Sequence, residues 1–360
     1  MAERKRPRKD GSAAPGKARR VADAAVDAGG DAPERRGRFM SWVLMSLAVI
    51  AVLIGLVWMF GPRESGRFNP PEIAELPEDL DNYLFQEESG VRPDVARRIV
   101  WAGRTGVKTP VSIVYLHGFS ATLQELRPVP DLIAAWRGSN LYFARLNGHG
   151  MDKASMGAAR VDDWARDVAE AIAIGKRIGE KVVVIGSSTG GTLAAMAARD
   201  PELGPQIAGV VLVSPNFRPL NRWTFLARQP LARQWLPILA GGERCFEPLN
   251  ERHRMFWTSC YPVVATLPMA ALAAEAEGTN FSAATQPLLA LWSDDDQVVD
   301  PAVTKRVLES WGGEVTIKQV TVGPGDDPSA HVIAGDILSP GQTAPVATGI
   351  NGWITRNFGD

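Results

Sequence analysis

The feature that most constrains the fold is a regular alternation of apolar strand-like runs with helical stretches, which begins near Arg98. Several of these runs are apolar almost throughout, as strands covered on both faces of a sheet are. Such alternation is typical of an α/β domain, with a mostly parallel central sheet and helices on both faces. The predicted strands cover residues 111–116, 141–146, 181–185, 207–213, 287–292 and 315–322, and the predicted helices cover 162–178, 189–198, 302–311 and 346–357.

One stretch, residues 216–284, interrupts this alternation without an evident strand of its own. It is rich in aromatic residues interleaved with arginines. About 70 residues is too long for a bare loop in a compact domain. We therefore predict a helical cap inserted over one end of the sheet, within a single α/β domain that covers residues 98–360.

Residues 39–60 form an uncharged apolar run of 22 residues, with Trp42 and Trp58 near its two ends. As a helix this run would be about 33 Å long, enough to cross a hydrocarbon core of about 30 Å. A cleaved signal peptide is the alternative, but its apolar region is shorter, about 7–15 residues, and is followed by small residues. We predict an N-terminal transmembrane helix.

The segments that flank this helix predict its orientation. Residues 1–38 carry a net charge of +5 and too little apolar surface to order themselves, so we predict a disordered, basic, cytoplasmic tail. Residues 61–97 contain several prolines and predict a spacer, with a short helix at 78–88. The domain that follows is then extracytoplasmic, which in a bacterium means that it is held at the inner membrane and faces the periplasm.

Charge and cysteine content exclude two classes of function. The chain beyond residue 38 has a net charge of −6, whereas a nucleic-acid binder needs a basic patch on its folded part. Cys245 and Cys260 are the only cysteines, and no Cys-x-x-Cys pair indicates a zinc site. Two free thiols and one disulfide both remain open, the disulfide being favoured outside the cytoplasm.

The sharpest motif is Gly186-Ser187-Ser188-Thr189-Gly190, which lies directly between a predicted strand and a predicted helix. Gly-x-Ser-x-Gly in this context places a serine at the tip of a sharp turn, with its hydroxyl exposed as a nucleophile. The alternative is a glycine-rich helix start with a capping serine. We predict that Ser188 is a catalytic nucleophile.

A serine nucleophile needs a base and an acid that orients it, and in this fold they follow in the order serine, acid, histidine. His253 and His331 follow Ser188, and His253 lies inside the predicted cap, so we predict His331 as the base. The acid is expected after the strand at 287–292, where Asp294, Asp295 and Asp296 are adjacent. We predict Asp296, with the other two acids as alternatives.

Catalysis also needs two backbone N–H groups that stabilise the oxyanion. One is expected from Thr189, the residue after the nucleophile, and the other from Phe119 in the loop after the strand at 111–116. Gly118 lets the backbone approach closely, and His117 is predicted to be a buried structural residue.

These residues resemble the α/β-hydrolase superfamily, and within it the monoacylglycerol lipase/esterase-like serine hydrolases with a helical cap. The resemblance covers residues 98–358. Thr189 departs from the family pattern, which often has Met or another apolar residue there, but its backbone donor is unaffected. The segments that carry the resemblance are HGFS at 117–120, RLNGHG at 145–150, GSSTGG at 186–191, WSDDDQVVDP at 292–301 and SAHVIAGD at 329–336.

The resemblance implies hydrolysis of an ester or thioester through an acyl-enzyme on Ser188, with no metal and no cofactor. The location at a membrane points to lipid esters such as acylglycerols or lysophospholipids. Acyl transfer with the same three residues is an alternative, and a membrane-tethered binding module without activity is a weaker one. The sequence assigns neither the natural ester nor an oligomeric state.

Overall fold

The computed structural model describes residues 32–359, with side chains from Gly37 onward. The described residues form two units, one that ends at Val57 and one that begins at Trp58. Helix α1 (Ala32–Phe60) supplies the described part of the first unit up to Val57, and its Gly37–Phe60 portion is long and apolar enough to cross a membrane. Helix α1 begins within the tail predicted over residues 1–38, and residues 1–31 of that tail lie outside the described residues.

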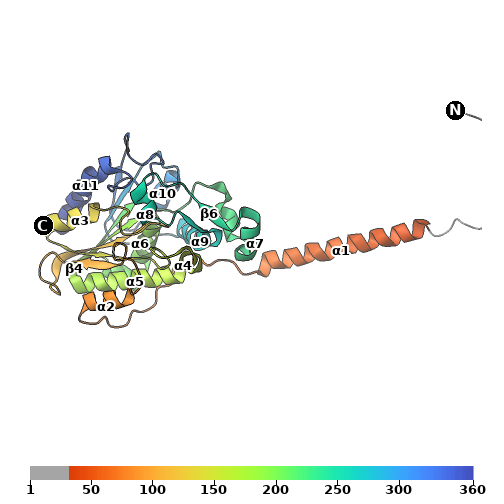
Figure 1. The fold of residues 1–360 in the computed structure, drawn as a ribbon, viewed down its shortest axis with the longest axis horizontal. Helices are drawn as coiled ribbons and strands as arrows, with labels where there is room; N and C mark the ends of the chain where they lie inside the picture. Colours follow the sequence, from red (N-terminus) through yellow and green to blue (C-terminus); the bar gives the residue numbers. More distant parts are fainter. Residues whose placement is uncertain (1–31, 360) are drawn as a thin grey trace, which may run out of the picture. The chain divides into compact units, whose positions relative to one another are not determined.

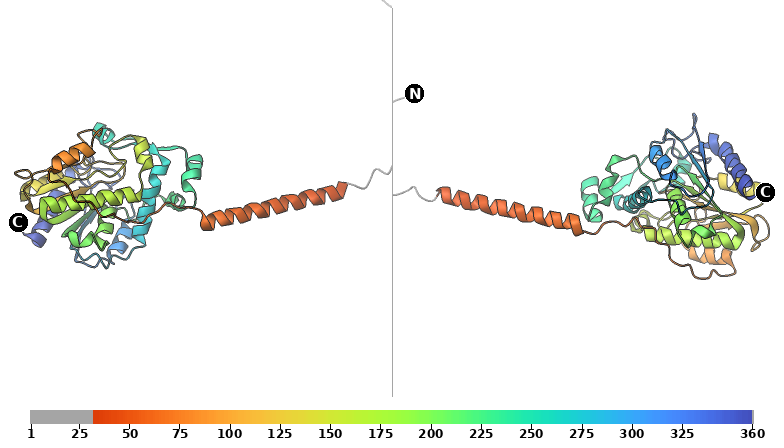
Figure 2. Two further views of the ribbon diagram at one scale, coloured as in Figure 1. Left: turned by 90° about the horizontal axis from the view of Figure 1, so that it is seen from below. Right: turned by 180° about the vertical axis from the view of Figure 1, so that it is seen from behind.

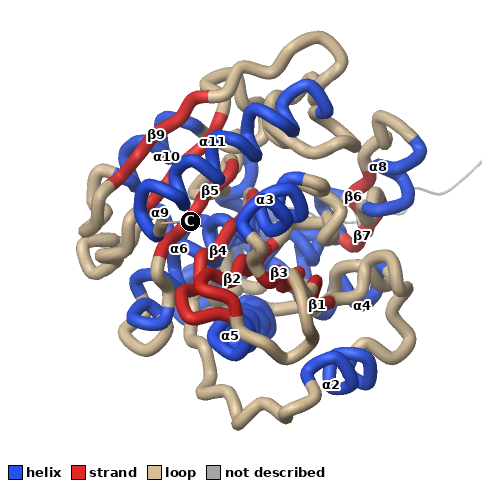
Figure 3. Tube along the Cα trace, turned by 90° about the vertical axis from the view of Figure 1, so that its left-hand side faces the viewer, coloured by secondary structure: helices blue, strands red, loops and turns tan. Residues whose placement is uncertain are grey.

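The second unit is built on a seven-stranded sheet with the order β1-β3-β2-β4-β5-β8-β9. The edge strand β1 is antiparallel to β3, and all other neighbouring strands of the sheet are parallel. Figure 3 shows these strands crossing the body as one layer from β9 to β1. The predicted, mostly parallel sheet is confirmed. The strands are β1 (Arg98–Val100), β2 (Thr109–Leu116), β3 (Asn140–Phe143), β4 (Gly179–Ser187), β5 (Gly209–Val213), β8 (Leu288–Trp292) and β9 (Val315–Gln319).

Helices cover both faces of the sheet, because successive side chains of a strand point to opposite sides. In β2, Val114 and Leu116 belong to the core that contains α5 and α6. Ile113 and Tyr115 belong to the other core, which contains α3 and α11. The burial of both faces explains why the strands are apolar throughout. The helices outside the cap are α2 (Leu80–Glu87), α3 (Val129–Arg137), α4 (Lys153–Ala158), α5 (Val161–Ile178), α6 (Thr189–Arg199), α10 (Pro301–Leu308) and α11 (Pro340–Phe358), with a 3₁₀ turn η1 (Gly204–Gln206).

Helix α5 illustrates how the sequence forms these elements. Trp164, Val168 and Ile172 recur every four residues, so they share one buried face of the helix. At its start, the Asp163 carboxylate accepts a hydrogen bond of 2.9 Å from the backbone N–H of Arg160, which satisfies a donor that the helix cannot. The helix therefore has a fixed first turn and a fixed apolar face toward β2 and β4.

Residues 216–284 leave the sheet after β5 and return to it at β8 (Figure 1). In both views of Figure 2 the green to teal segments around α7 lie at one end of the body. The sequence predicts no strand here, but β6 and β7 form a short antiparallel hairpin. Each strand has three residues, too few to give a recognisable alternation. The cap elements are η2 (Arg222–Arg228), α7 (Ala232–Ala240), β6 (Glu243–Cys245), α8 (Glu251–Phe256), β7 (Cys260–Pro262), η3 (Val263–Ala265) and α9 (Thr266–Glu277).

The predicted spacer, residues 61–97, is attached to the body by buried ion pairs. The buried Glu88 carboxylate receives two hydrogen bonds from the Arg145 guanidinium, at 2.6 and 2.7 Å. It also pairs with Arg97 at 3.0 Å. Removing one partner would leave an uncompensated buried charge, so these contacts hold the spacer and the β1 edge to the domain.

Candidate active site

Ser188 occupies the tight turn between β4 and α6, at the carboxyl edge of the sheet. Its φ of 49° lies in the left-handed region, which a serine seldom adopts. Glycines on both sides make the turn possible. A Cβ on Gly186 would lie 2.4 Å from the Gly190 carbonyl oxygen, and one on Gly190 would lie 2.3 Å from the Leu116 carbonyl oxygen. The motif therefore forms the strained strand–turn–helix that is expected for a nucleophilic serine.

His331 lies in the loop after β9 and contacts Ser188 across 143 positions of the sequence. Its Nε2 lies 3.0 Å from the Ser188 hydroxyl oxygen, and its Nδ1 lies 2.8 Å from Oδ2 of Asp296. When Nδ1 carries the proton and donates it to the carboxylate, Nε2 is free to accept the serine proton. The structure thus brings the three side chains singled out in the sequence into one hydrogen-bonded line.

Asp296 is the one of the three adjacent acids that reaches the imidazole. Its other oxygen, Oδ1, accepts hydrogen bonds from the backbone N–H groups of Val298 and Val299, at 2.8 and 2.9 Å. These bonds fix the carboxylate in its buried position. Asp294 and Asp295 are exposed, so the loop directs one acid inward and two toward solvent.

The surroundings of His331 favour its protonated form. Burial of the imidazole by itself lowers its pKa. The Asp296 carboxylate, through its charge and its hydrogen bond, together with the charges of Glu125 and Asp327, outweighs burial and raises the pKa of His331 above its ordinary value. An imidazole in this setting is a stronger acceptor for the proton of Ser188.

The loop after β2 runs directly beside Ser188. A Cβ on Gly118 would lie 3.2 Å from the Cβ of Ser188, so a larger residue would crowd the serine. Phe119 is the next residue of this loop. Thr189 is the first residue of α6, where a backbone N–H has no partner within the helix. Both predicted oxyanion donors therefore belong to segments that border the serine, and their role remains a prediction.

Two buried acids that sequence reasoning missed hold these loops. Glu125 accepts hydrogen bonds from the Gly118 backbone N–H at 2.7 Å and from the Tyr115 hydroxyl at 2.9 Å. Burial raises the pKa of Glu125, and these two bonds oppose the rise. Asp327 accepts the backbone N–H of His331 at 3.2 Å. Neither acid belongs to a recognisable motif, and no pattern of neighbouring residues signals either of them in the sequence.

Comparisons with known proteins point to hydrolases. A family model described as "Serine aminopeptidase, S33" matches residues 108–248, which include the turn at Ser188. A thermostable monoacylglycerol lipase from Bacillus sp. (strain H-257) is 32% identical over 105 residues, or 29% of this chain and 40% of that protein. This chain therefore matches less than half the length of that curated relative.

Solved structures align with most of the second unit. One belongs to work on LipS and LipT, two metagenome-derived lipolytic enzymes, with a TM-score of 0.60 and 20% identity over 74% of this chain and 99% of that chain. The protein has the α/β-hydrolase fold. A monoacylglycerol lipase from Paleococcus ferrophilus aligns with a TM-score of 0.54 and 16% identity, over 72% of this chain and 98% of that chain. A soluble variant of monoglyceride lipase from Saccharomyces cerevisiae aligns with a TM-score of 0.54 and 13% identity, over 73% and 91%.

The cap of this α/β-hydrolase fold touches the loop that borders Ser188. The rings of Phe119 and Tyr261 make an edge contact, with centroids 5.3 Å apart. The backbone N–H of Thr258 donates to the Ser120 carbonyl oxygen at 2.8 Å. Movement of the cap segment around β7 would therefore be transmitted to the loop that carries Phe119.

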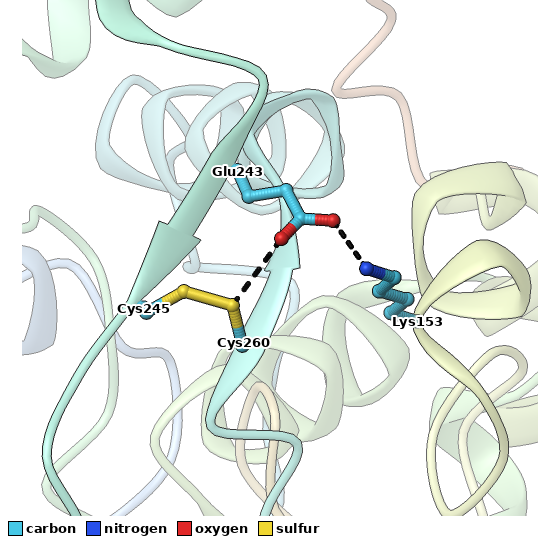
Figure 4. The surroundings of a disulfide bond; sticks show 4 residues. All are labelled: Lys153, Glu243, Cys245 and Cys260. Atoms are coloured by element: carbon cyan, nitrogen blue, oxygen red, sulfur yellow. Dashed lines mark hydrogen bonds and ion pairs between the residues drawn. A yellow bond between two sulfur atoms is a disulfide. The ribbon is translucent and has the colours of Figure 1, made fainter.

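The β6–β7 hairpin of the cap is closed by a disulfide between Cys245 and Cys260, which resolves the question the sequence left open. Figure 4 shows Glu243 beside this disulfide and the ion pair that joins Glu243 to Lys153 of α4. Glu243 and the two sulfurs lie close enough to hold a metal ion. Zinc binds cysteine as the thiolate, however, and the sulfurs of a disulfide carry no such charge.

The other described histidines have structural surroundings. His117 is buried, as predicted, and its Nε2 accepts the backbone N–H of Leu146 at 3.1 Å. Burial lowers the pKa of His117 well below its ordinary value and lowers the pKa of His149 to about 4, so both remain neutral. His253 packs between Phe246 and Trp257 inside the cap. None of these three lies in the line formed by Ser188, His331 and Asp296.

Proposed function

We propose that the protein is a serine hydrolase that cleaves carboxylic esters through an acyl-enzyme on Ser188. One observation carries the proposal, which is the hydrogen-bonded line from the Ser188 hydroxyl through the His331 imidazole to the Asp296 carboxylate. A serine hydroxyl alone is a weak nucleophile. Together with a histidine base and a carboxylate that orients it, it forms the arrangement that activates a serine in acyl transfer. The match to a monoacylglycerol lipase and the likeness to lipolytic enzymes support the same chemistry.

The reaction proceeds in two acyl-transfer steps. The Ser188 oxygen attacks the ester carbonyl carbon while its proton moves to Nε2 of His331. The negative charge that develops on the carbonyl oxygen is stabilised by the N–H groups of Phe119 and Thr189. When the tetrahedral intermediate collapses, His331 returns the proton to the leaving alcohol. Water, deprotonated by His331, then attacks the acyl carbon. The bond from this carbon to the Ser188 oxygen breaks as His331 returns the proton to that oxygen, which releases the acid, and Asp296 stabilises the imidazolium in both steps.

A lipid ester suits the apolar surroundings of the site. Phe119 packs in a cluster with Met156, Phe246 and Tyr261, so the loop beside Ser188 has apolar surroundings of the kind that ligand sites for apolar groups have. We therefore expect release of fatty acid from monoacylglycerols or lysophospholipids, faster than cleavage of an amino-acid anilide. The measurement is a panel of esters of graded chain length with the full chain in detergent. Cleavage of the anilide alone would contradict the proposal.

We expect the activity to depend on the protonation of His331. The imidazole must be neutral to accept the serine proton, so kcat/KM should fall as the pH drops through the His331 pKa. Because its neighbours raise this pKa, the acidic limb should lie above the value of about 6.5 that is typical of histidine. A pH profile of kcat/KM measures the limb directly.

A variant of Glu125 tests the source of this shift. Glu125→Gln keeps an oxygen that can accept from Gly118 but removes a charge that raises the pKa of His331. The acidic limb should therefore move to lower pH in this variant. Glu125→Ala serves as the comparison, because it also removes the acceptor and should lower kcat. An unchanged limb in Glu125→Gln would mean that Glu125 contributes no charge to the site.

We infer that residues 39–60 of α1 cross a bilayer, with residues 1–38 in the cytoplasm and the catalytic unit on the other side. The basic flank before the helix and the disulfide in the cap both support this orientation. Protease added to the outer face of intact cells without an outer membrane should digest the catalytic unit and leave an N-terminal tag intact. Detergent should expose the tag, and protection of the catalytic unit before detergent would contradict the orientation.

A further inference from the structure

The residues that follow helix α1 are fastened to the cap. The carbonyl oxygen of Pro62, two residues after the helix end at Phe60, accepts the backbone N–H of Leu231 at 2.8 Å. The Glu64 carboxylate, only 6% exposed, receives two hydrogen bonds from the Arg233 guanidinium, at 2.6 and 2.7 Å. Paired bonds of this kind between guanidinium and carboxylate are among the strongest in proteins. We call these contacts of Pro62 and Glu64 the juxtamembrane clamp.

The next residues continue along the cap. A Cβ on Gly66 would lie 2.1 Å from the carbonyl oxygen of Ala271 in α9, so the chain passes this helix in close contact. The segment from Pro62 to Gly66 is therefore a packed part of the cap and not a free tether.

The clamp limits how far the cap can stand from a bilayer. A span that ends at Phe60 leaves two residues to reach Pro62, at most about 7 Å of chain. The headgroup layer outside the hydrocarbon core is roughly 5–8 Å deep on each side. The start of α7 is consequently held within or beside this layer.

The cap exposes large apolar side chains on the two elements nearest the clamp. In η2, Trp223 and Phe225 are 57% and 51% exposed, and in α7, Ile238 and Leu239 are 86% and 70% exposed. The opposite sides of η2 and α7 already pack together around Leu236. We call the four exposed side chains the apolar face of the cap. Figure 1 shows α7 beside β6 at one end of the body.

Two arginines near this face, Arg218 and Arg233, are paired with Glu277 and Glu64, so Arg222 and Arg228 carry its excess positive charge. Residues 218–242 contain four arginines and no acid, although the chain beyond residue 38 has a net charge of −6. The Arg222 guanidinium lies over the Trp223 ring, 5.1 Å from its centroid. Arg228 and Phe225 line a pocket of about 430 Å³, which Glu64 and Glu275 line as well. Exposed aromatic and aliphatic residues framed by arginines are typical of surfaces that lie in an anionic lipid interface.

We infer that the apolar face of the cap lies in the headgroup region of the bilayer that α1 spans, and that the juxtamembrane clamp holds it there. This inference rests on the proposed membrane span. It implies that the substrate is an ester already dissolved in the bilayer, since such a molecule meets the cap without crossing water. Lipids of negative charge are the matching surface for Arg222 and Arg228, because Arg218 and Arg233 already pair with Glu277 and Glu64.

The test uses the full chain in vesicles of phosphatidylethanolamine and phosphatidylglycerol. A fluorophore is attached to Ile238→Cys, with the native disulfide left oxidised, and in a matched protein to Arg104→Cys. Arg104 is exposed and precedes β2, at the opposite edge of the sheet from the cap. A lipid-borne nitroxide should quench the label at 238 several-fold more than the label at 104, and iodide should do the reverse. Equal quenching by iodide at both positions would overturn the inference.

Two further variants separate the parts of the proposal. Glu64→Gln weakens the clamp and should increase iodide quenching at position 238, and no increase would overturn the role of the clamp. Ile238→Asp with Leu239→Asp should slow hydrolysis of monoacylglycerol in vesicles by about fivefold or more, because charge is costly at that depth. Hydrolysis of a short water-soluble ester should stay unchanged. Equal rates on the vesicle substrate would contradict the inference.

A separate measurement tests whether α1 spans the membrane. Extraction of the full chain from vesicles by alkaline carbonate would mean that α1 does not span, which is a failure of the proposed location. Retention in the vesicles with an iodide-accessible label at 238 would be a failure of the docked cap alone.

Discussion

Replacing Ser188 with alanine is expected to lower kcat for ester hydrolysis by about 10⁶, the loss seen when the nucleophile of a serine hydrolase is removed. The alanine cannot form the acyl-enzyme, and His331 then has no hydroxyl proton to accept. Fatty-acid release from a monoacylglycerol, followed to long times at high enzyme concentration, measures the residual rate.

The adjacent serine provides a matched control. Ser187 is buried as the last residue of β4, so Ser187→Ala makes the same chemical change one position away. We expect this variant to keep most of the activity, and both variants to unfold at similar temperatures. A Ser188→Ala protein with near-normal activity would rule out the mechanism.

Replacing Asp296 with asparagine is expected to lower kcat by about 10⁴, since loss of the orienting carboxylate leaves the imidazole in the wrong tautomer. The backbone N–H groups of Val298 and Val299 would keep the asparagine oxygen in the position of Oδ1. The amide NH₂ would then face Nδ1 of His331 and donate to it. The imidazole proton would move to Nε2, where it blocks uptake of the proton of Ser188.

The neighbouring acids are the controls for this variant. Asp294→Asn and Asp295→Asn make the same change at exposed positions and should hydrolyse the ester at near wild-type rates. Lowered activity in Asp295→Asn equal to that of Asp296→Asn would mean that the loop can present a different acid to His331.

The sequence was most informative where a residue type is required by local geometry. The turn at Ser188 needs glycines at positions 186 and 190, because the backbone of neighbouring segments lies within 2.4 Å of where a Cβ would be. The spacing of these two glycines in the sequence therefore indicates a close approach between backbone segments in the fold. The strands could be predicted equally well, because β2, β4, β5 and β8 are covered on both faces and therefore consist of apolar residues.

Features that depend on contacts between distant segments have no recognisable pattern in the local sequence. Glu125 and Asp327 are single acids in loops, and their roles depend on backbone N–H groups that only the fold brings near. The choice among Asp294, Asp295 and Asp296 likewise depends on which way a loop turns. The clamp between Glu64 and Arg233 joins residues 169 positions apart. Charge and burial at these sites follow from the completed fold and not from neighbours in the chain.

The short strands of the cap could not be predicted from the sequence for a different reason. The hairpin of β6 and β7 has three residues in each strand, and its pairing aligns Cys245 with Cys260. Alternation of side chains over three residues does not differ from chance, so sequence periodicity predicted only helices there. The disulfide then fixes a hairpin that has little apolar surface of its own, since every residue of β6 is exposed.

The central claim, that Ser188 is the nucleophile, is tested most directly by covalent labelling of the full chain with a fluorophosphonate. Trypsin would release residues 182–199, which contain Ser187, Ser188 and Thr189. Fragmentation of this peptide in a mass spectrometer should locate the adduct on Ser188, and the label should be lost in Ser188→Ala. An adduct on another residue, or full ester hydrolysis after labelling of Ser188, would contradict the account.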